Sequence, residues 1–109
     1  MSKRYQQAML VSCLIPWDEG GELIEDVFRH EVRETLKQFN NLYIFGTAGE
    51  GYAVTSTQFE EIAGIFWEET AIDGIYPMVC IIAMSTAQVL ERIGIAHDLG
   101  FRVFQITLP

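Results

Sequence analysis

The stretch of the sequence best suited to chemistry is a glycine-rich segment that runs from Gly46 to Tyr52 (GTAGEGY). Gly46, Gly49 and Gly51 let the backbone approach a ligand closely, and consecutive N–H groups in such a loop can receive a carboxylate or a phosphate. Thr47 adds a hydroxyl group. The segment matches neither the Walker A pattern nor G-x-G-x-x-G. Its residues therefore indicate either an anion site or a tight connection between two elements.

The other reactive side chains lie in ordinary structural patterns. Cys13 and Cys80 lie inside apolar runs without CxxC spacing, which favours buried free thiols over a disulfide, a metal ligand or a nucleophile. His30 and His97 fall within helical patterns, which favours surface or packing roles over catalysis. Because nothing resembles a metal-binding motif, we expect no metal site and no cofactor.

Four short apolar runs predict buried strands over residues 8–14, 42–45, 77–83 and 103–108. Three helical patterns alternate with these strands, over residues 24–39, 55–70 and 85–99. Thr55 with Gln58 and Ser85 with Gln88 have the form of capping boxes, which predicts where the second and third helices begin. Gly100 fits the position just after the end of the third helix.

The resulting order alternates strands with helices at roughly 30 residues per unit, and such short crossovers require a parallel sheet. Two architectures use this order, an open doubly wound sheet and a closed barrel. Periodicity does not separate them. In both, functional residues gather at the carboxyl ends of the strands, where the glycine-rich segment is expected to lie.

Three motifs resemble those of a known family. The strand that ends in G-T-A-G-E, followed by a helix that starts with threonine, resembles the G-[ST]-[ST]-G-E signature of the dihydrodipicolinate synthase / N-acetylneuraminate lyase family of class I, Schiff-base aldolases. Residues 15–21 (IPWDEGG) are similar to the family's Thr-Pro-Phe/Trp-x-x-x-Gly turn, and Leu108-Pro109 stands where members have Thr/Val-Pro-Tyr. The spacing agrees over essentially the whole chain.

The resemblance implies a fold that this chain does not complete. Members are (β/α)₈ TIM barrels, which need about 250 residues. We therefore expect residues 1–109 to form a single incomplete barrel domain, the N-terminal part with the first four strands and three helices. We do not expect such a piece to be stable alone, because its first and fourth strands would be open edges.

The resemblance also implies a mechanism for the parent protein, that of a carbon–carbon lyase or synthase. In the family, a lysine at the end of the sixth strand forms an imine with pyruvate or another 2-keto acid, and a tyrosine on the fifth strand relays protons. Neither position exists here. Lys3 and Lys37, the lysines of the sequence, are expected to be solvated surface charges rather than desolvated nucleophiles. The 109-residue chain alone is therefore expected to be inactive.

Within the matching loop, Thr47 falls on the family's proton-relay hydroxyl, beside the substrate carboxylate. The implied substrate-binding residues are Gly46, Thr47, Ala48 through its backbone N–H, and Gly49. Ala48 replaces the usual threonine or serine, and Ile15 replaces a threonine after the first strand. These departures indicate a divergent member whose substrate need not be pyruvate.

Several neighbouring polar residues have structural interpretations. Glu50 stands just before a helix, where a carboxylate more often orders the loop than catalyses. Tyr52 can line a pocket or pack on the helix. Asp18 and Glu19 precede a glycine pair and predict a turn.

Charge and composition limit the partners. The net charge of -8 repels nucleic acid and anionic lipid, and no signal peptide or membrane span is evident, so a cytoplasmic location is expected. A small keto acid is the expected partner, and the family implies a homo-oligomer, tetramer or dimer, for the parent. Two alternatives remain: a non-catalytic barrel that binds a small carboxylate or sugar acid, and a self-sufficient half-barrel or open-sheet binding module.

Overall fold

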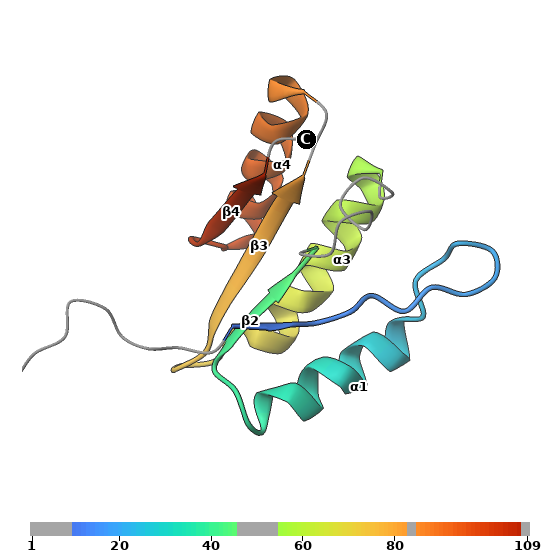
Figure 1. The fold of residues 1–109 in the computed structure, drawn as a ribbon, viewed down its shortest axis with the longest axis vertical. Helices are drawn as coiled ribbons and strands as arrows, with labels where there is room; N and C mark the ends of the chain where they lie inside the picture. The colour runs from blue at the N-terminus through green and yellow to red at the C-terminus, as the bar shows by residue number, and fades with distance from the viewer. Residues whose placement is uncertain (1–9, 46–54, 83–84, 108–109) are drawn as a thin grey trace, which may run out of the picture.

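The computed structural model describes residues 10–45, 55–82 and 85–107. Over these ranges strands and helices alternate (Figure 1). The elements are β1 (Leu10–Ser12), α1 (Glu25–Leu36), β2 (Asn41–Ile44), α3 (Ser56–Thr70), β3 (Tyr76–Ile82), α4 (Thr86–Leu99) and β4 (Phe104–Thr107). The predicted order is confirmed. The first strand ends earlier than predicted, because Leu14 has left the sheet and its side chain is 56% exposed.

The order of the strands separates the two architectures that periodicity left open. The sheet has the order β1-β2-β3-β4, and each strand is parallel to the next. A doubly wound sheet reverses its strand order at a switch point, whereas a barrel does not. α3 lies between α1 and α4 along the sheet, and both α3 and α4 pack on β3 (Figure 1). The chain therefore winds in the manner of a barrel.

One face of the sheet is covered by the helices. In β2, Leu42 and Ile44 are fully buried, whereas Asn41 and Tyr43 on the opposite face are partly exposed. This alternation follows from the period of two along a strand. In a closed barrel the second face would be the interior.

Stacked aromatic rings hold the helices to one another and to the sheet. Phe66 of α3 stacks on Phe28 of α1, with ring centroids 6.4 Å apart, and on Phe101, just before β4, at 6.1 Å. Trp67 packs at 60° against Phe101, with centroids 5.1 Å apart. The α3 rings thus connect the first helix with the segment that leads into the last strand.

The predicted helix caps are present. The Thr55 hydroxyl accepts a hydrogen bond from the backbone N–H of Gln58, and the Gln58 side chain accepts one from the Thr55 N–H, both at 3.0 Å. Ser85 caps α4 by accepting from the Gln88 N–H at 3.2 Å. Gly100 ends α4 with a φ of 126°. The helix limits therefore follow from local sequence.

The buried stripe of α4 does not consist of apolar residues alone. Leu90, one of the apolar residues of this helix, is 64% exposed, whereas Arg92 is only 4% exposed. The buried positions are Val89, Arg92 and Ala96, which share one side of the helix. Leu90 lies to the side of this packed face.

The buried stripe of α1 is narrower than the apolar stripe of its sequence. Phe28 and Val32 are fully buried, but Ile24 and Val27 are exposed. α1 packs against α3 on one side, so only part of its apolar stripe meets the core. No helix in the described part of the chain is long and apolar enough to cross a membrane.

A network of ion pairs links the outer sides of α1 and α3. The Glu69 carboxylate accepts hydrogen bonds from Arg33 at 2.7 Å and 2.9 Å and from Arg29 at 2.8 Å. Arg29 also donates to Glu68 at 2.8 Å and to Glu25 at 2.9 Å. The Glu69 side chain is 10% exposed, so the network is centred on a largely buried carboxylate.

We expect Glu69→Gln to destabilise the protein in a pH-dependent way. Hydrogen bonds from Arg33, and then from Arg29, hold the pKa of Glu69 below its usual value despite burial. Their stabilisation is therefore present above the unfolded-state pKa of about 4.3 and is lost as the pH falls through the lower folded-state pKa. Urea unfolding should show a loss of about 1 kcal/mol at neutral pH.

The matched control is Glu60→Gln, on the exposed side of the same helix. It should leave the free energy of unfolding unchanged both at neutral pH and in acid. The difference between the Glu69→Gln and wild-type proteins should disappear as the pH falls below the lowered folded-state pKa of Glu69. A difference that persists undiminished in acid would show that the charge of Glu69 does not stabilise the fold.

Candidate functional site

The candidate site lies at the carboxyl edge of the sheet, because parallel strands bring their carboxyl ends to one edge. The segment after β2 contains the residues that the sequence singles out. These are Gly46, Thr47, Ala48 and Gly49, with Glu50 and Tyr52 beyond them, and all lie outside the described residues. The structure instead shows what anchors this segment, Phe45 before it and Thr55 after it.

Phe45 has an unusual backbone conformation at the end of β2. Its φ is 62°, although its bulky side chain disfavours the left-handed region by about 1–2 kcal/mol. The ring is 1% exposed and stacks on Phe59 of α3, with centroids 5.0 Å apart. This packing offsets the strain and turns the backbone sharply at the start of the glycine-rich segment. Such strain is concentrated at functional sites in proteins.

The start of α3 is tied to the connection that follows β1. The side-chain nitrogen of Gln58 donates to the Gly21 carbonyl at 3.4 Å. Within that connection, the Asp18 carboxylate accepts from the N–H groups of Gly20 at 2.8 Å and Glu22 at 2.9 Å. The predicted turn at Asp18 is thus confirmed. A side-chain hydrogen bond therefore ties the connection between β1 and α1 to the first turn of α3.

Ile15 shows what the departure from the family's usual threonine does structurally. Its side chain is 5% exposed and belongs to the hydrophobic core. The chain then forms a bridge between Trp17 and Leu23 and returns toward α1. The Ile15 side chain therefore packs in the core at this edge of the sheet, where a threonine would place a hydroxyl group.

Arg92 brings a positive charge to this region that the sequence analysis missed. Its guanidinium carbon lies 5.3 Å from the centre of the Phe59 ring, a cation–π geometry. Burial lowers the pKa of Arg92, and the Glu91 carboxylate raises it, but a guanidinium stays charged at neutral pH. The burial of Arg92 could have been inferred from its spacing, because Arg92 follows the buried Val89 by three residues and therefore lies on the same side of α4.

The first turns of α3 and α4 also meet at this edge. The Ser56 hydroxyl donates a hydrogen bond to the Glu91 carboxylate. α3 packs along α4, and both helices begin at the carboxyl ends of strands. Their N-terminal dipoles therefore add positive potential at the edge.

The two cysteines do not provide a nucleophile. Both are free and buried, as predicted. Burial, with a contribution from Glu31, raises the pKa of Cys13 to about 12. Burial also raises the pKa of Cys80, whose thiol donates to the Gln105 side chain at 3.5 Å. Neither thiol is ionised at neutral pH, and only the thiolate attacks carbonyl carbon efficiently.

Lys37 is unsuited to imine formation, as predicted. Its side chain is 69% exposed and pairs with Glu34 at 2.7 Å. It follows the last turn of α1, at the amino edge of the sheet. Lys3 lies outside the described residues, and His30 and His97 are exposed as expected. Within the described ranges, no group of three His, Cys, Asp or Glu residues could hold a metal ion.

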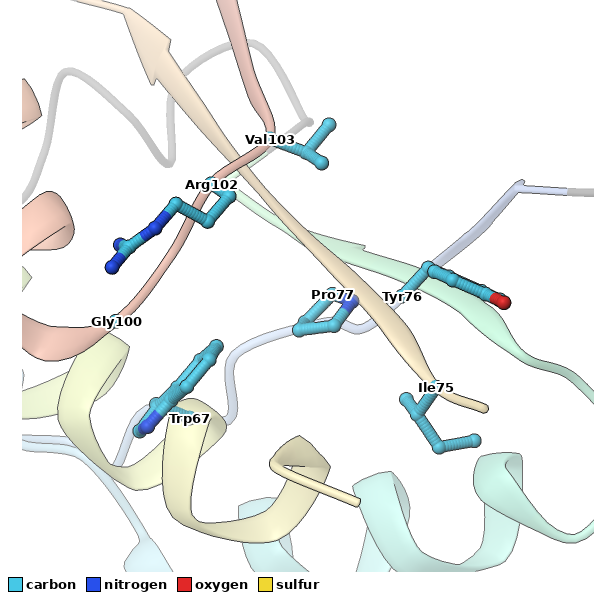
Figure 2. Close-up of a pocket in the computed structure, with 7 residues that line it drawn as sticks. All are labelled: Trp67, Ile75, Tyr76, Pro77, Gly100, Arg102 and Val103. Carbon is cyan, nitrogen blue, oxygen red and sulfur yellow. The ribbon is translucent and has the colours of Figure 1, made fainter. Parts of the chain in front are cut away.

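A cavity of about 200 Å³ opens at the opposite edge of the sheet. Figure 2 shows its lining around the first residues of β3: Trp67, Ile75, Tyr76, Pro77, Gly100, Arg102 and Val103. The guanidinium of Arg102 donates to the carbonyls of Phe101 at 2.9 Å and His97 at 3.3 Å. The cavity is mostly apolar and lies at the amino ends of the strands, away from the candidate site.

Comparison with solved structures identifies the fold. N-acetylneuraminate lyase from Fusobacterium nucleatum complexed with pyruvate superposes with a TM-score of 0.85 over 94% of this chain, at 17% sequence identity. The chain has the fold of the N-terminal part of a (β/α)₈ barrel. No family model and no curated protein matches the sequence.

Two further structures show the same partial-barrel fold. The 4-hydroxy-tetrahydrodipicolinate synthase from Methylacidiphilum fumariolicum matches 95% of the chain with a TM-score of 0.81 and 15% identity. The N-acetylneuraminate lyase from Proteus mirabilis matches 94% with a TM-score of 0.77 and 18% identity. The chain spans 35% of the length of each of these proteins. The predicted partial barrel and the structural resemblance to both enzyme groups are confirmed, and the doubly wound alternative is excluded.

Proposed function

We propose that the chain is the N-terminal part of a carbon–carbon lyase or synthase that acts on pyruvate or a related 2-keto acid through a lysine imine. The observation that carries the proposal is the place of the G-T-A-G-E motif. It follows β2, and the residue that stands between the strand and the motif, Phe45, has a left-handed backbone conformation at the carboxyl edge. A carboxyl-edge loop of this kind is where barrel enzymes bind their substrates.

In the proposed mechanism the catalytic and substrate-binding residues come from different strands of the barrel. A lysine amine attacks the keto carbon, and water leaves as the imine forms. The chain's own contribution is the loop at the end of β2, where Gly46, Thr47, Gly49 and the Ala48 N–H hold the substrate carboxylate. The Thr47 hydroxyl relays protons. The lysine belongs to a later strand, so residues 1–109 alone are inactive. A homo-oligomeric, cytoplasmic parent enzyme is part of the same proposal.

Ala48→Ser should strengthen the binding of pyruvate to the intact protein. A restored hydroxyl adds one hydrogen bond to the carboxylate, worth about 0.5–1.5 kcal/mol, or about twofold to twelvefold in affinity. Thr47→Val, which removes the neighbouring hydroxyl, should weaken binding by a similar factor. Calorimetric titration with pyruvate measures both effects.

Thr57→Ala is the matched control, because Thr57 is an exposed hydroxyl residue in the first turn of α3. Its affinity for pyruvate should equal that of the wild type. If Ala48→Ser and Thr47→Val also bind like the wild type, the loop does not hold the carboxylate.

Ala48 supports a second candidate, a barrel that binds a small carboxylate or sugar acid without turning it over. The missing hydroxyl weakens the resemblance to the catalytic loops at the residue that would hold the substrate. Reduction with borohydride separates the two candidates, because only an imine is trapped by hydride.

A further inference from the structure

The cavity of about 200 Å³ at the amino ends of the strands, which we call the amino-edge cavity, is built from three consecutive segments of the chain. Trp67 comes from the last turn of α3, Tyr76 and Pro77 are the first residues of β3, and Gly100 and Arg102 belong to the connection between α4 and β4. Barrel enzymes bind their substrates at the opposite edge. A ligand of this cavity is therefore a molecule other than the substrate.

The apolar wall of the amino-edge cavity suits one flat ring. Figure 2 shows the rings of Trp67 and Pro77 on the same side of β3, whereas the Tyr76 ring lies on the other side. The Trp67 indole packs on Phe101, with centroids 5.1 Å apart, so this wall is already in place before a ligand binds. An apolar cavity of about 150 Å³ is large enough to bind benzene, so the larger space here admits a single aromatic ring with a short substituent.

Arg102 is the residue with a charged side chain among those that line the cavity. Its Nη1 donates to the carbonyls of Phe101 at 2.9 Å and His97 at 3.3 Å, which holds the guanidinium against the end of α4. Within the described ranges, its Nε and Nη2 donate to no acceptor. Figure 2 shows the guanidinium on the side of β3 that carries the Trp67 and Pro77 rings.

The open edge of this guanidinium matches a carboxylate. The Nε–H and Nη2–H groups of an arginine point in nearly parallel directions, and such a pair binds the two oxygens of one carboxylate. Arg33 and Lys37 already have carboxylate partners on the protein, Glu69 and Glu34. Arg102 has none among the described residues, although the chain has a net charge of -8. Its remaining donors are therefore available to an external anion.

We propose that the amino-edge cavity binds a small aromatic carboxylic acid. The ring of this ligand lies against Trp67 and Pro77, and its carboxylate accepts hydrogen bonds from Nε and Nη2 of Arg102. The seven described lining residues include no carboxylate, so a cationic ligand of the same shape finds no partner there. Because the site lies at the edge opposite to the candidate substrate site, the inference goes beyond the proposed function and does not depend on it.

Three ligands of similar size and different charge test the proposal on the intact protein. In calorimetric titrations, phenylacetate should bind at least about tenfold more tightly than phenylacetamide, as expected for hydrogen bonds to a charged group. Phenylethylamine, the cation, should bind more weakly still. An excess of pyruvate should not change the affinity for phenylacetate. Absence of phenylacetate binding, equal affinities for the three ligands, or displacement by pyruvate would overturn the inference.

Substitution of Arg102 tests the role of the guanidinium. Arg102→Met should lower the affinity for phenylacetate to that for phenylacetamide and leave the latter unchanged. Arg102→Gln, which keeps a donor but loses the charge, should behave in the same way, and thermal unfolding shows whether each variant folds. Lys37→Met is the matched control, because Lys37 is a cation near the same edge that does not line the cavity. A folded Arg102 variant that still prefers phenylacetate would overturn the inference, and the comparison of ligands on the wild type holds independently of both variants.

Discussion

Gly100→Ala should lower the free energy of unfolding by about 3 kcal/mol or more, the sum of backbone strain and a steric clash. Gly100 has a φ of +126°, a conformation that residues with a side chain rarely adopt. A β-carbon there would lie 2.6 Å from Cε2 of Trp67 and closer still to Cζ2. Because Trp67 packs on Phe101, its ring cannot move without disturbing the core. Urea unfolding measures the loss.

Substitutions at two other glycines separate the contribution of backbone strain from that of the steric clash. Gly74 has a φ of +88° but nothing within 4 Å of an added β-carbon, so Gly74→Ala should cost only the strain, about 1–2 kcal/mol. Gly94 lies inside α4 with equally open space, so Gly94→Ala should stabilise by about 0.5–1 kcal/mol. A Gly100→Ala protein that loses no more than Gly74→Ala would contradict the proposed contact with Trp67.

Phe66→Ala should cost about 3–5 kcal/mol, the second large effect. The Phe66 side chain is fully buried and stacks on rings from both sides, Phe28 of α1 and Phe101 before β4. Its removal leaves a cavity where α1, α3 and the last strand meet. The loss should appear as a lower midpoint in urea, with a smaller loss for Phe66→Leu, which refills part of the space.

Leu90→Ala provides the comparison for Phe66→Ala. Leu90 is a large apolar residue in a helix, but its side chain is 64% exposed. Its replacement should change the free energy of unfolding by less than about 0.5 kcal/mol. Comparable losses for the two substitutions would mean that the aromatic stack is not the centre of the core.

The parts of the fold that were predictable from sequence are those with local causes. Continuous apolar runs predicted the strands, and the capping box of Thr55 and Gln58 predicted the start of α3. Gly100 predicted the end of α4, although its close approach to Trp67 comes from tertiary packing. The order of the strands in the sheet is a long-range property, and it entered the sequence analysis through family resemblance rather than through periodicity.

The candidate site was predictable only in part. The motif in residues 46–49 drew attention to the end of β2, but these residues lie outside the described ranges. The left-handed backbone of Phe45 had no signal, because phenylalanine is a poor residue for that conformation. Arg92 had no signal other than its spacing, because charged side chains in helices ordinarily face solvent, whereas its place in the stripe with Val89 buries it. The conformation of Phe45 and the burial of Arg92 both depend on tertiary packing against Phe59, which no local sequence pattern encodes.

Borohydride reduction in the presence of pyruvate tests the proposed lysine imine most directly. Hydride converts the imine to a stable secondary amine, so mass spectrometry of the intact and digested protein reveals both the adduct and its position. We predict one adduct per intact chain, on the lysine that ends the sixth strand, and none on Lys3, on Lys37 or on a protein limited to residues 1–109. A pyruvate-binding protein that forms no adduct, or an adduct on Lys37, would contradict the proposed chemistry.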